Sequence, residues 1–358
     1  MQPLVRKIHF GERCLALTLV VLLTLLLCGY APKTEPEEPQ GQIYLYGEAH
    51  ADDRCMEKEL VIWGEFYDDG MRDLFIEYPC YTAEYLNQWM HEDSDEILMQ
   101  LYADMRGTIA HSENVLDFYR AIKTDYPETV FHGTDVGHSY SSTGARYLSE
   151  LRKAGQADSE AFALAQTVVK QGRTYYSMGE PDCYAYRENL MAENFIREYD
   201  RLGGISIMGI YGSMHTYPEQ MDYTGTVPSM ARQLAAHFGD ALHTKDLSLA
   251  DPVRTDRIVV NGKEYEATYF GAQDLSGTGF PFTQREYWRL EDAYEDMKTC
   301  PLTGDVLPYH NYVMKVETGQ VFVIDYTGLD GQVTRLYYRS DGDVWNDLPT
   351  TTGFDPEG

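Results

Sequence analysis

Short apolar segments recur along the chain at intervals that suit buried strands. Each one is followed directly by glycine, proline or polar residues, as expected where a strand of a parallel sheet ends. We therefore predict four strands of this kind, at Ile43–Tyr46, Leu74–Ile76, Thr129–Phe131 and Ile205–Ile210.

The segments between these strands carry helical patterns. One of them places apolar residues four, three and four positions apart, at Met56, Leu60, Trp63 and Tyr67. Two longer helical patterns cover residues 145–178 and 182–204. Strands that alternate with helices predict an α/β domain over residues 42–250, in which a mainly parallel sheet is flanked by helices.

The last hundred residues follow a different pattern. Ile258–Lys263 contains an Asn-Gly pair between apolar residues, which predicts a β-hairpin. One helix is predicted at Arg285–Lys298. After it, three segments alternate apolar and polar residues, as in an antiparallel meander: Tyr312–Glu317, Gln320–Tyr326 and Val333–Arg339. Residues 251–358 are therefore predicted to form an antiparallel, β-rich C-terminal extension.

The N-terminus has the features of an export signal. Basic residues precede the apolar run Leu15–Leu27, which is short for a membrane-spanning helix, so residues 1–27 are predicted to be a signal peptide. Leu25-Leu26-Leu27-Cys28 resembles the cleavage box of a bacterial lipoprotein and predicts lipidation at Cys28. An uncleaved anchor is the alternative. Residues 28–41, rich in proline and glutamate, are predicted to be a tether. Both alternatives place the body outside the cytoplasm, anchored to the bacterial cell membrane.

Composition excludes one class of partner. The chain has 57 acidic and 29 basic residues, for a formal charge of −28. A polyanion of this size repels phosphate backbones, so nucleic-acid binding is excluded, whereas cations, metals or neutral substrates are favoured near its clefts. No CxxC spacing occurs. The cysteines of the body therefore leave disulfides and buried thiols both open: Cys55, Cys80, Cys183 and Cys300.

Ionisable residues stand where the predicted strands end. Glu48 and His50 follow the first strand, and alternate residues of an extended backbone share one face. Glu77 follows the second strand, Asp135 the third and His215 the fourth. Because ligands of open α/β sheets bind at the carboxyl ends of the strands, we expect these side chains to converge on one site. A single histidine at a strand end would more simply be structural, but four strands ending in this way indicate a functional site.

Other residues near these motifs add to the expected site. His138 follows Asp135 by three residues, and a place in the site and the solvated position more usual for a histidine in a loop are both open to it. We expect Tyr78, Tyr211 and Tyr217 to wall the pocket. The sequence contains no GxSxG nucleophile elbow, HExxH zinc motif, Walker A loop or GxGxxG fingerprint. A covalent serine enzyme is therefore not indicated.

Taken together, the motifs resemble those of a known superfamily, the erythromycin-esterase-like, ChaN-like and TraB/TIKI proteins. The resemblance covers roughly residues 42–240 and includes, in the family's order, GEAH at 47–50, IEYP at 76–79, GTD at 133–135 and GSMH at 212–215. A fifth match is the helix Arg187-Glu188-Asn189-Leu190-Met191-Ala192-Glu193-Asn194. The resemblance implies an EreA/ChaN-like α/β fold, with a site of two histidines, two or three carboxylates and one arginine, Arg187.

Two kinds of chemistry suit such a site. A histidine flanked by carboxylates is oriented and has a raised pKa, which suits a general base that activates water. Arg187 would then hold a substrate carboxylate or stabilise an oxyanion. In this hypothesis the catalytic residues are His50, Glu48, Glu77, Arg187, His215 and Asp135. In the other, His50, Glu77 and His215 ligate a divalent metal ion that generates hydroxide from bound water.

The predicted function is therefore that of an exported, membrane-tethered hydrolase of the esterase or metallopeptidase type, acting on an ester or peptide. The alternative is a ChaN-like lipoprotein that binds haem or iron, and a third possibility is a surface interaction module. Acidic and basic groups at several strand ends favour catalysis, because a haem pocket would need a larger apolar surface.

Overall fold

Two sheets of different kinds make up the described part of the chain. The computed structural model describes residues 41–275, 281–345 and 348–358. The first sheet is wholly parallel, with the strand order β3-β2-β4-β1-β5. Its strands are β1 (Ile43–Glu48), β2 (Asp73–Ile76), β3 (Val130–Gly133), β4 (Ile207–Gly212) and β5 (Leu242–Asp246). The predicted parallel sheet is thus present.

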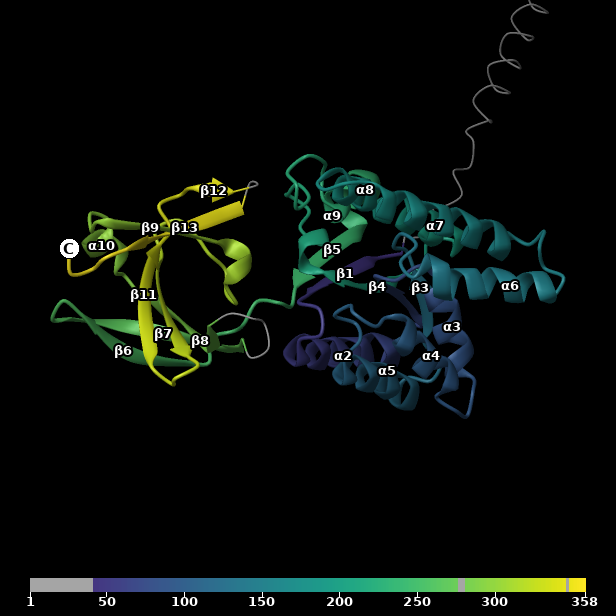
Figure 1. Cartoon of the computed structure of the whole chain (residues 1–358), viewed down its shortest axis with the longest axis horizontal. Helices are drawn as coiled ribbons and strands as arrows, with labels where there is room; N and C mark the ends of the chain where they lie inside the picture. The colour runs from purple at the N-terminus through teal and green to yellow at the C-terminus, as the bar shows by residue number, and fades with distance from the viewer. Residues whose placement is uncertain (1–40, 276–280, 346–347) are drawn as a thin grey trace, which may run out of the picture. The chain divides into compact units, whose positions relative to one another are not determined.

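Helices cover both faces of this sheet (Figure 1). On one face lie α2 (Asp53–Asp68), α3 (Cys80–Met90), α4 (Glu96–Asp104) and α5 (Glu113–Asp125). The apolar cluster of that face continues to α6 (Ala145–Lys153) and α7 (Glu160–Ser177). On the other face lie α8 (Asp182–Arg201) and α9 (Met230–Phe238).

The alternation of β1 shows how the sheet is held between these layers. Ile43 and Leu45 are fully buried in one cluster with Phe195 of α8, whereas Tyr44 and Tyr46 contact Phe66 of α2 on the opposite face. Successive residues of a strand point to opposite faces, so apolar residues throughout β1 bury both sides.

The strand order decides which motifs meet. Strand β4 lies between β1 and β2, and Glu48 at the end of β1 pairs in register with Gly212 at the end of β4. The carboxyl ends of β1, β2 and β4 are therefore neighbours, although β4 follows β1 by more than 150 residues.

The second sheet is antiparallel and follows after Asp246, with the order β12-β13-β11-β10-β8-β7-β6 and β9 paired to β13. Its strands are β6 (Arg254–Val260), β7 (Lys263–Asp274), β8 (Phe282–Leu290), β9 (Leu302–Pro308), β10 (Val321–Gly328), β11 (Val333–Arg339), β12 (Val344–Trp345) and β13 (Leu348–Phe354). The Asn261-Gly262 turn joins β6 and β7, and both turn residues have the positive φ that a tight hairpin requires. The predicted fold class, a helix-flanked parallel sheet with an antiparallel extension, is confirmed.

Some predicted elements of the extension are wrong. The first part of Arg285–Lys298, up to Leu290, belongs to strand β8, and within this range only α10 (Tyr294–Met297) is helical. Tyr287 and Trp288 are both buried because this sheet has an apolar cluster on each face, so adjacent apolar residues suit a strand here. Tyr312–Glu317 is not a strand either; its apolar side chains pack in the same cluster as Phe322.

The helical pattern at 145–178 is also interrupted. It forms α6 and α7, separated by a turn in which Gly155 has a φ of +73°. The predicted signal peptide (1–27), the lipidation site Cys28 and the tether up to residue 40 lie outside the described residues. Within residues 41–275, 281–345 and 348–358, no helix combines the length and apolarity needed to span a bilayer.

Candidate active site

The turn after β1 presents the first two candidate residues. His50 lies in a turn that leads directly into α2, where the Asp52 carboxylate caps the helix by accepting the N–H groups of Arg54 and Cys55. Atom Nδ1 of His50 lies 2.7 Å from Oε1 of Glu48. The imidazole is thus fixed on one side by a carboxylate, while 40% of its side-chain surface stays exposed.

Glu77, one residue beyond β2, stands at the centre of the cluster. Its Oε1 accepts a hydrogen bond from Nη2 of Arg187 at 2.5 Å, and its Oε2 accepts the backbone N–H of Gly212 at 2.5 Å. Oε1 also lies 3.7 Å from Nε2 of His50 and 3.6 Å from Nε2 of His215. Glycine suits position 212, because a Cβ there would lie only 2.9 Å from Nε2 of His50.

Arg187 of α8 joins two strand ends. Its Nε and Nη2 donate to the two carboxylate oxygens of Asp135 at 3.0 and 2.6 Å, which is a bidentate pair. Asp135, just after β3, is only 1% exposed, so its charge depends on this partner. Most N–H groups of Arg187 are therefore committed to other residues of the protein.

His215 lies behind Arg187. Its Nε2 is 3.2 Å from Nη1 of Arg187, and its Nδ1 is 2.6 Å from Oε2 of Glu188. Burial alone would lower the pKa of His215, but the carboxylates of Glu188 and Glu77 raise it. The structure thus brings together all six residues predicted to be catalytic.

Glu188 is a site residue that the sequence analysis did not single out. It is 3% exposed and belongs to the same helix as Arg187, and its Oε1 accepts the backbone N–H of Met230 at 2.5 Å. Its place inside the Arg187–Asn194 motif was the available signal, but adjacent residues of a helix do not face the same way. Only the folded chain, in which α8 lies beside the segment that follows β4, shows that Glu188 reaches His215.

Neighbouring charges set the protonation states. Glu77 raises the pKa of His50 to about 9, although burial acts in the opposite direction. Burial would raise the pKa of Glu77, but the neighbouring imidazoles and guanidinium lower it to about 2. Burial likewise disfavours the charge of Asp135, yet Arg187 holds the pKa of that carboxyl well below its usual range. At neutral pH an imidazolium at His50 therefore lies beside two carboxylates and a guanidinium.

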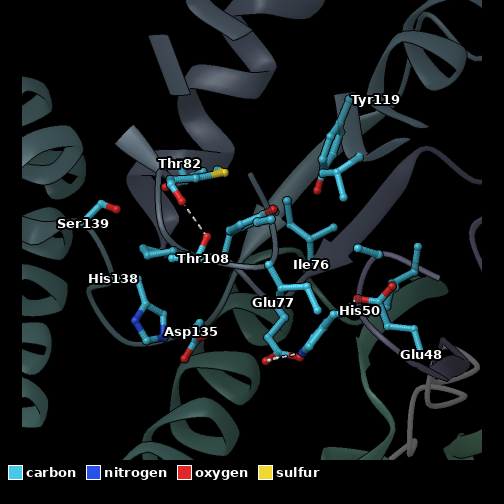
Figure 2. Close-up of a pocket in the computed structure, with 18 of the residues that line it drawn as sticks. Glu48, His50, Ile76, Glu77, Thr82, Thr108, Tyr119, Asp135, His138 and Ser139 are labelled. Atoms are coloured by element: carbon cyan, nitrogen blue, oxygen red, sulfur yellow. Dashed lines mark hydrogen bonds and ion pairs between the residues drawn. The ribbon is translucent and has the colours of Figure 1, made fainter. Parts of the chain in front are cut away.

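The cluster borders a cavity of about 290 Å³ (Figure 2). Glu48, His50, Glu77, Asp135 and Arg187 line it. His215 is not among the lining residues, so the two imidazoles do not share the cavity as the strand-end argument suggested. Of these two histidines, His50 is the one that lines the cavity.

Some of the residues considered for the pocket wall line the cavity, and others do not. Tyr78 lines the cavity, and His138 lines it too, with Nε2 3.1 Å from Oδ2 of Asp135. Tyr211 is instead fully buried and hydrogen bonded to Thr134. Tyr217 is hydrogen bonded to Asp246. Neither of these two tyrosines is a lining residue, because tertiary packing turns them away from the cavity.

The side chains proposed as metal ligands do not fit a metal ion as they lie. Across the described ranges, no group of three or more His, Cys, Asp or Glu side chains could hold one. Nitrogens of the Arg187 guanidinium stand 2.5 Å from Oε1 of Glu77 and 3.2 Å from Nε2 of His215. A metal ion bound by those atoms would meet a fixed positive charge at close range. His50, Glu77 and His215 are therefore not assigned to a metal ion.

The cysteines of the body are free thiols: Cys55, Cys80, Cys183 and Cys300. Burial raises the pKa of Cys55 and of Cys80 to about 12. Both thiols therefore stay protonated at neutral pH, which makes them poor nucleophiles and poor metal ligands.

The fold of the chain is distantly similar to several solved structures. No family model and no curated protein matches the chain. A crystal structure of a protein from Bacillus cereus is similar with 12% identity and a TM-score of 0.44, over 88% of this chain and 85% of that one. A mutant of the erythromycin esterase EreC in its open conformation gives 12% identity and a TM-score of 0.42, over 64% and 76%. A succinoglycan biosynthesis protein gives 11% and 0.42, over 69% and 76%. Similarity this distant says nothing about activity, so the function is argued from the site itself.

Proposed function

We propose that the protein is a hydrolase that activates water with His50 and forms no covalent intermediate. The observation that carries this proposal is the placement of one accessible imidazole between two carboxylates at a cavity. Glu48 holds Nδ1 at 2.7 Å, and Glu77 lies 3.7 Å from Nε2. A carboxylate on one ring nitrogen fixes the tautomer and leaves the other nitrogen for proton transfer.

The proposed step uses the neutral form of His50. Nε2 takes a proton from a water molecule as the water oxygen attacks the acyl carbon, and the resulting imidazolium returns that proton to the leaving oxygen or nitrogen. Oε1 of Glu77 is close enough to Nε2 to accept the second hydrogen bond of this water. One proton is borrowed and returned, so the residue is unchanged after each turnover.

Arg187 serves as a positioning residue in this mechanism. It was expected to bind a substrate carboxylate or an oxyanion, but it donates to Asp135 and Glu77 and faces His215. Its positive charge compensates the charges of the two carboxylates, and its hydrogen bond to Glu77 holds that side chain in place beside His50. His215, held by Glu188, supports the guanidinium from behind.

The substrate class stays an ester or a peptide in this proposal. The cavity, at about 290 Å³, lies at the small end of ligand pockets, which span about 300–1,000 Å³. It suits a small molecule, or one group of a larger substrate, better than a whole macrocycle.

We also propose a location for the protein, from the export signal and the lipidation site predicted in its sequence. Acylation at Cys28 would hold the hydrolase at the outer face of the cell membrane. Metabolic labelling with a fatty acid that is lost in Cys28→Ser would support this, and labelling that persists would contradict it.

Turnover by the full chain tests the activity. We expect hydrolysis of p-nitrophenyl acetate or of short peptides without an initial burst, because no acyl-enzyme accumulates. His50→Gln should lower kcat/KM by about 10²–10⁴-fold, the range for loss of a general base. His237→Gln, on the exposed side of α9, is the matched control and should change nothing.

Three outcomes would count against the proposal. Full activity in His50→Gln would remove His50 from the mechanism. Loss of activity after chelation, with stoichiometric metal in the untreated protein, would favour the metal hypothesis. A shift of the Soret band when haemin is added, without any hydrolysis, would favour the haem-carrier alternative.

A further inference from the structure

The cavity has an apolar wall that begins beside the catalytic cluster. Side chains of α2, of α5 and of the carboxyl-terminal parts of β2 and β4 form it: Met56, Ile76, Val115, Phe118, Tyr119 and Ile210. In Figure 2 Ile76 lies between Tyr119 and the pair Glu77 and His50. A molecule held at His50 therefore has apolar surface next to it in the same cavity.

The positive groups of the cavity are bound to the catalytic cluster and not to this wall. Arg187 is the one arginine or lysine among the described residues that line the cavity. Its N–H groups donate to Asp135 and Glu77. The two lining histidines also lie beside carboxylates of the cluster, His50 beside Glu77 and His138 beside Asp135. The apolar wall therefore offers no cation to a ligand.

Glu59 of α2 borders the wall as well, but it presents no charge to a ligand. The residue is 1% exposed. Burial raises the pKa of its carboxyl group, which favours the uncharged form. A carboxylate that a ligand brought against the wall would meet apolar side chains without a counter-ion, and an unpaired charge in such surroundings is costly.

The proposed mechanism decides which part of a substrate meets the wall. His50 returns its proton to the leaving atom, so the leaving group lies at this imidazole, whose side chain is 40% exposed. Ile76, Phe118 and Tyr119 of the wall are buried. The leaving group can then depart on the exposed side of the site, while the acyl group lies on the buried side.

We propose that the apolar wall binds the acyl group of the substrate, and that the protein hydrolyses esters or amides of uncharged, apolar acyl groups in preference to acyl groups that end in a carboxylate. The inference rests on the proposed hydrolase function and names the substrate class of the same site. Each methylene buried against the wall adds to binding, whereas a terminal carboxylate loses its hydration without gaining a partner.

Ketones test the binding without turnover, because their carbonyl carbon carries no leaving group. The series is butan-2-one, hexan-2-one and octan-2-one, and 7-oxooctanoate is octan-2-one with a carboxylate in place of its terminal methyl group. Dissociation constants for the full chain are measured by ligand-observed NMR. We expect binding to tighten about fourfold for each added methylene. We expect 7-oxooctanoate to bind at least about a hundredfold more weakly than octan-2-one.

Two isomeric esters test the orientation. Methyl hexanoate and pentyl acetate contain the same atoms, but the long chain belongs to the acyl group in the first and to the leaving group in the second. We expect kcat/KM, measured by pH-stat titration, to be at least about tenfold higher for methyl hexanoate, because its chain is buried in the transition state. An equal or higher value for pentyl acetate would overturn the acyl assignment.

Variants of the lining locate the bound chain. Ala110, between α4 and α5, also lines the cavity, and Ala110→Trp should weaken octan-2-one by at least about tenfold, because the longer chain loses its place at the wall. Val115→Trp narrows the same wall from α5 and serves if the first variant does not fold. Ala103→Trp, exposed on α4 and not a lining residue, is the matched control and should weaken neither ketone.

The binding and hydrolysis results can fail separately. Ketone binding that does not depend on chain length, or equal binding of octan-2-one and 7-oxooctanoate, would overturn the inference. Binding of octan-2-one that is unaffected in a folded Ala110→Trp or Val115→Trp variant would overturn it too, since the chain would then lie elsewhere. The expected order of ketones in a protein that hydrolyses neither ester would contradict the proposed function and leave this binding site in place. Hydrolysis without the order of ketones would do the reverse.

Discussion

Two clusters in the α/β domain combine the same chemical groups in different surroundings. In one, His50 stands between Glu48 and Glu77, with Arg187 beside them. In the other, His132 of β3 has Nδ1 2.7 Å from Glu198 and Nε2 2.8 Å from Asp73, and Arg201 pairs with Glu198.

The difference lies in access and in the number of ring nitrogens that are committed. The His132 side chain is 4% exposed, and both of its nitrogens are bonded to carboxylates. The His50 side chain is 40% exposed, and its Nε2 faces a cavity with no hydrogen-bonded partner at that nitrogen among the described residues. His132 is therefore a closed structural link, whereas His50 is free to exchange a proton.

The same types of residue can therefore build an active site or a structural link. In both clusters burial would lower the pKa of the imidazole, but the neighbouring carboxylates raise it. A raised pKa is equally useful to a buried ion pair and to a catalyst. What distinguishes the two clusters is the cavity. The residues around His50 line it, whereas those around His132 do not.

The largest expected effect is on stability, at the closed cluster. His132→Leu leaves Asp73 and Glu198 without their shared imidazole, and breaking a buried pair in this way costs about 3–5 kcal/mol of unfolding free energy. His50→Leu should cost less than about 1 kcal/mol, because that side chain is 40% exposed and only one of its ring nitrogens is hydrogen bonded to a carboxylate. Urea unfolding measures both, and equal losses would erase the proposed distinction.

The next effect is on activity. Glu48→Gln replaces the carboxylate on Nδ1 of His50 and disturbs the tautomer, so kcat/KM should fall roughly a hundredfold, about 2.7 kcal/mol in barrier. Glu198→Gln makes the same change on Nδ1 of His132. It should destabilise the protein but leave kcat/KM of the folded fraction within about twofold. A similar kinetic loss in both variants would contradict the assignment of roles.

The pH dependence of kcat/KM reports on His50. Glu77 raises the pKa of His50 to about 9, so the neutral base form grows as pH rises, and kcat/KM should increase with pH up to a limb near that value. Glu77→Gln removes the main cause of the raised pKa of His50. The limb should therefore move to lower pH by about one unit, which is a tenfold change in the acid dissociation constant of His50. The absolute rate will also change, so the position of the limb is the readout. A limb that stays in place would show that another group titrates.

The smallest effect is expected at the rim of the closed cluster. Arg201 is 57% exposed, and Glu198 keeps its bond to His132 when the guanidinium is lost. Arg201→Met should therefore cost only about 0.2–1 kcal/mol in unfolding free energy. A loss above about 2 kcal/mol would mean that this arginine is as essential to its cluster as the buried Arg187 is to the other.

Sequence patterns located the strands and the residues at their ends. Apolar runs followed by glycine or a charged residue mark the ends of β1 and β4 well, because a buried parallel strand must be apolar throughout. The same reasoning failed at Arg285–Lys298. That segment was expected to be helical, whereas its adjacent Tyr287 and Trp288 are buried on different faces of the second sheet.

The sequence patterns did not predict which side chains from distant parts of the chain contact one another. Glu59 follows Glu48 by eleven residues and would be taken for part of a charged helix face. Glu188 lies inside a quoted motif, but nothing in that motif names its partner, and His132 has no local signal at all. Their contacts depend on how α2, α8 and β3 pack, and packing distances of a few tenths of an ångström decide which carboxylate meets which imidazole.

What the chain determines by itself is the periodicity of its apolar residues and the placing of ionisable groups at the ends of strands. These follow from the short repeat of backbone geometry, which acts over a few residues. What only the folded molecule decided is that one imidazole opens to a cavity while a second is closed between two acids and a third is set behind a guanidinium. Burial and electrostatic pairing arise from residues far apart in the chain, so they exist only once the helices have packed on the sheet.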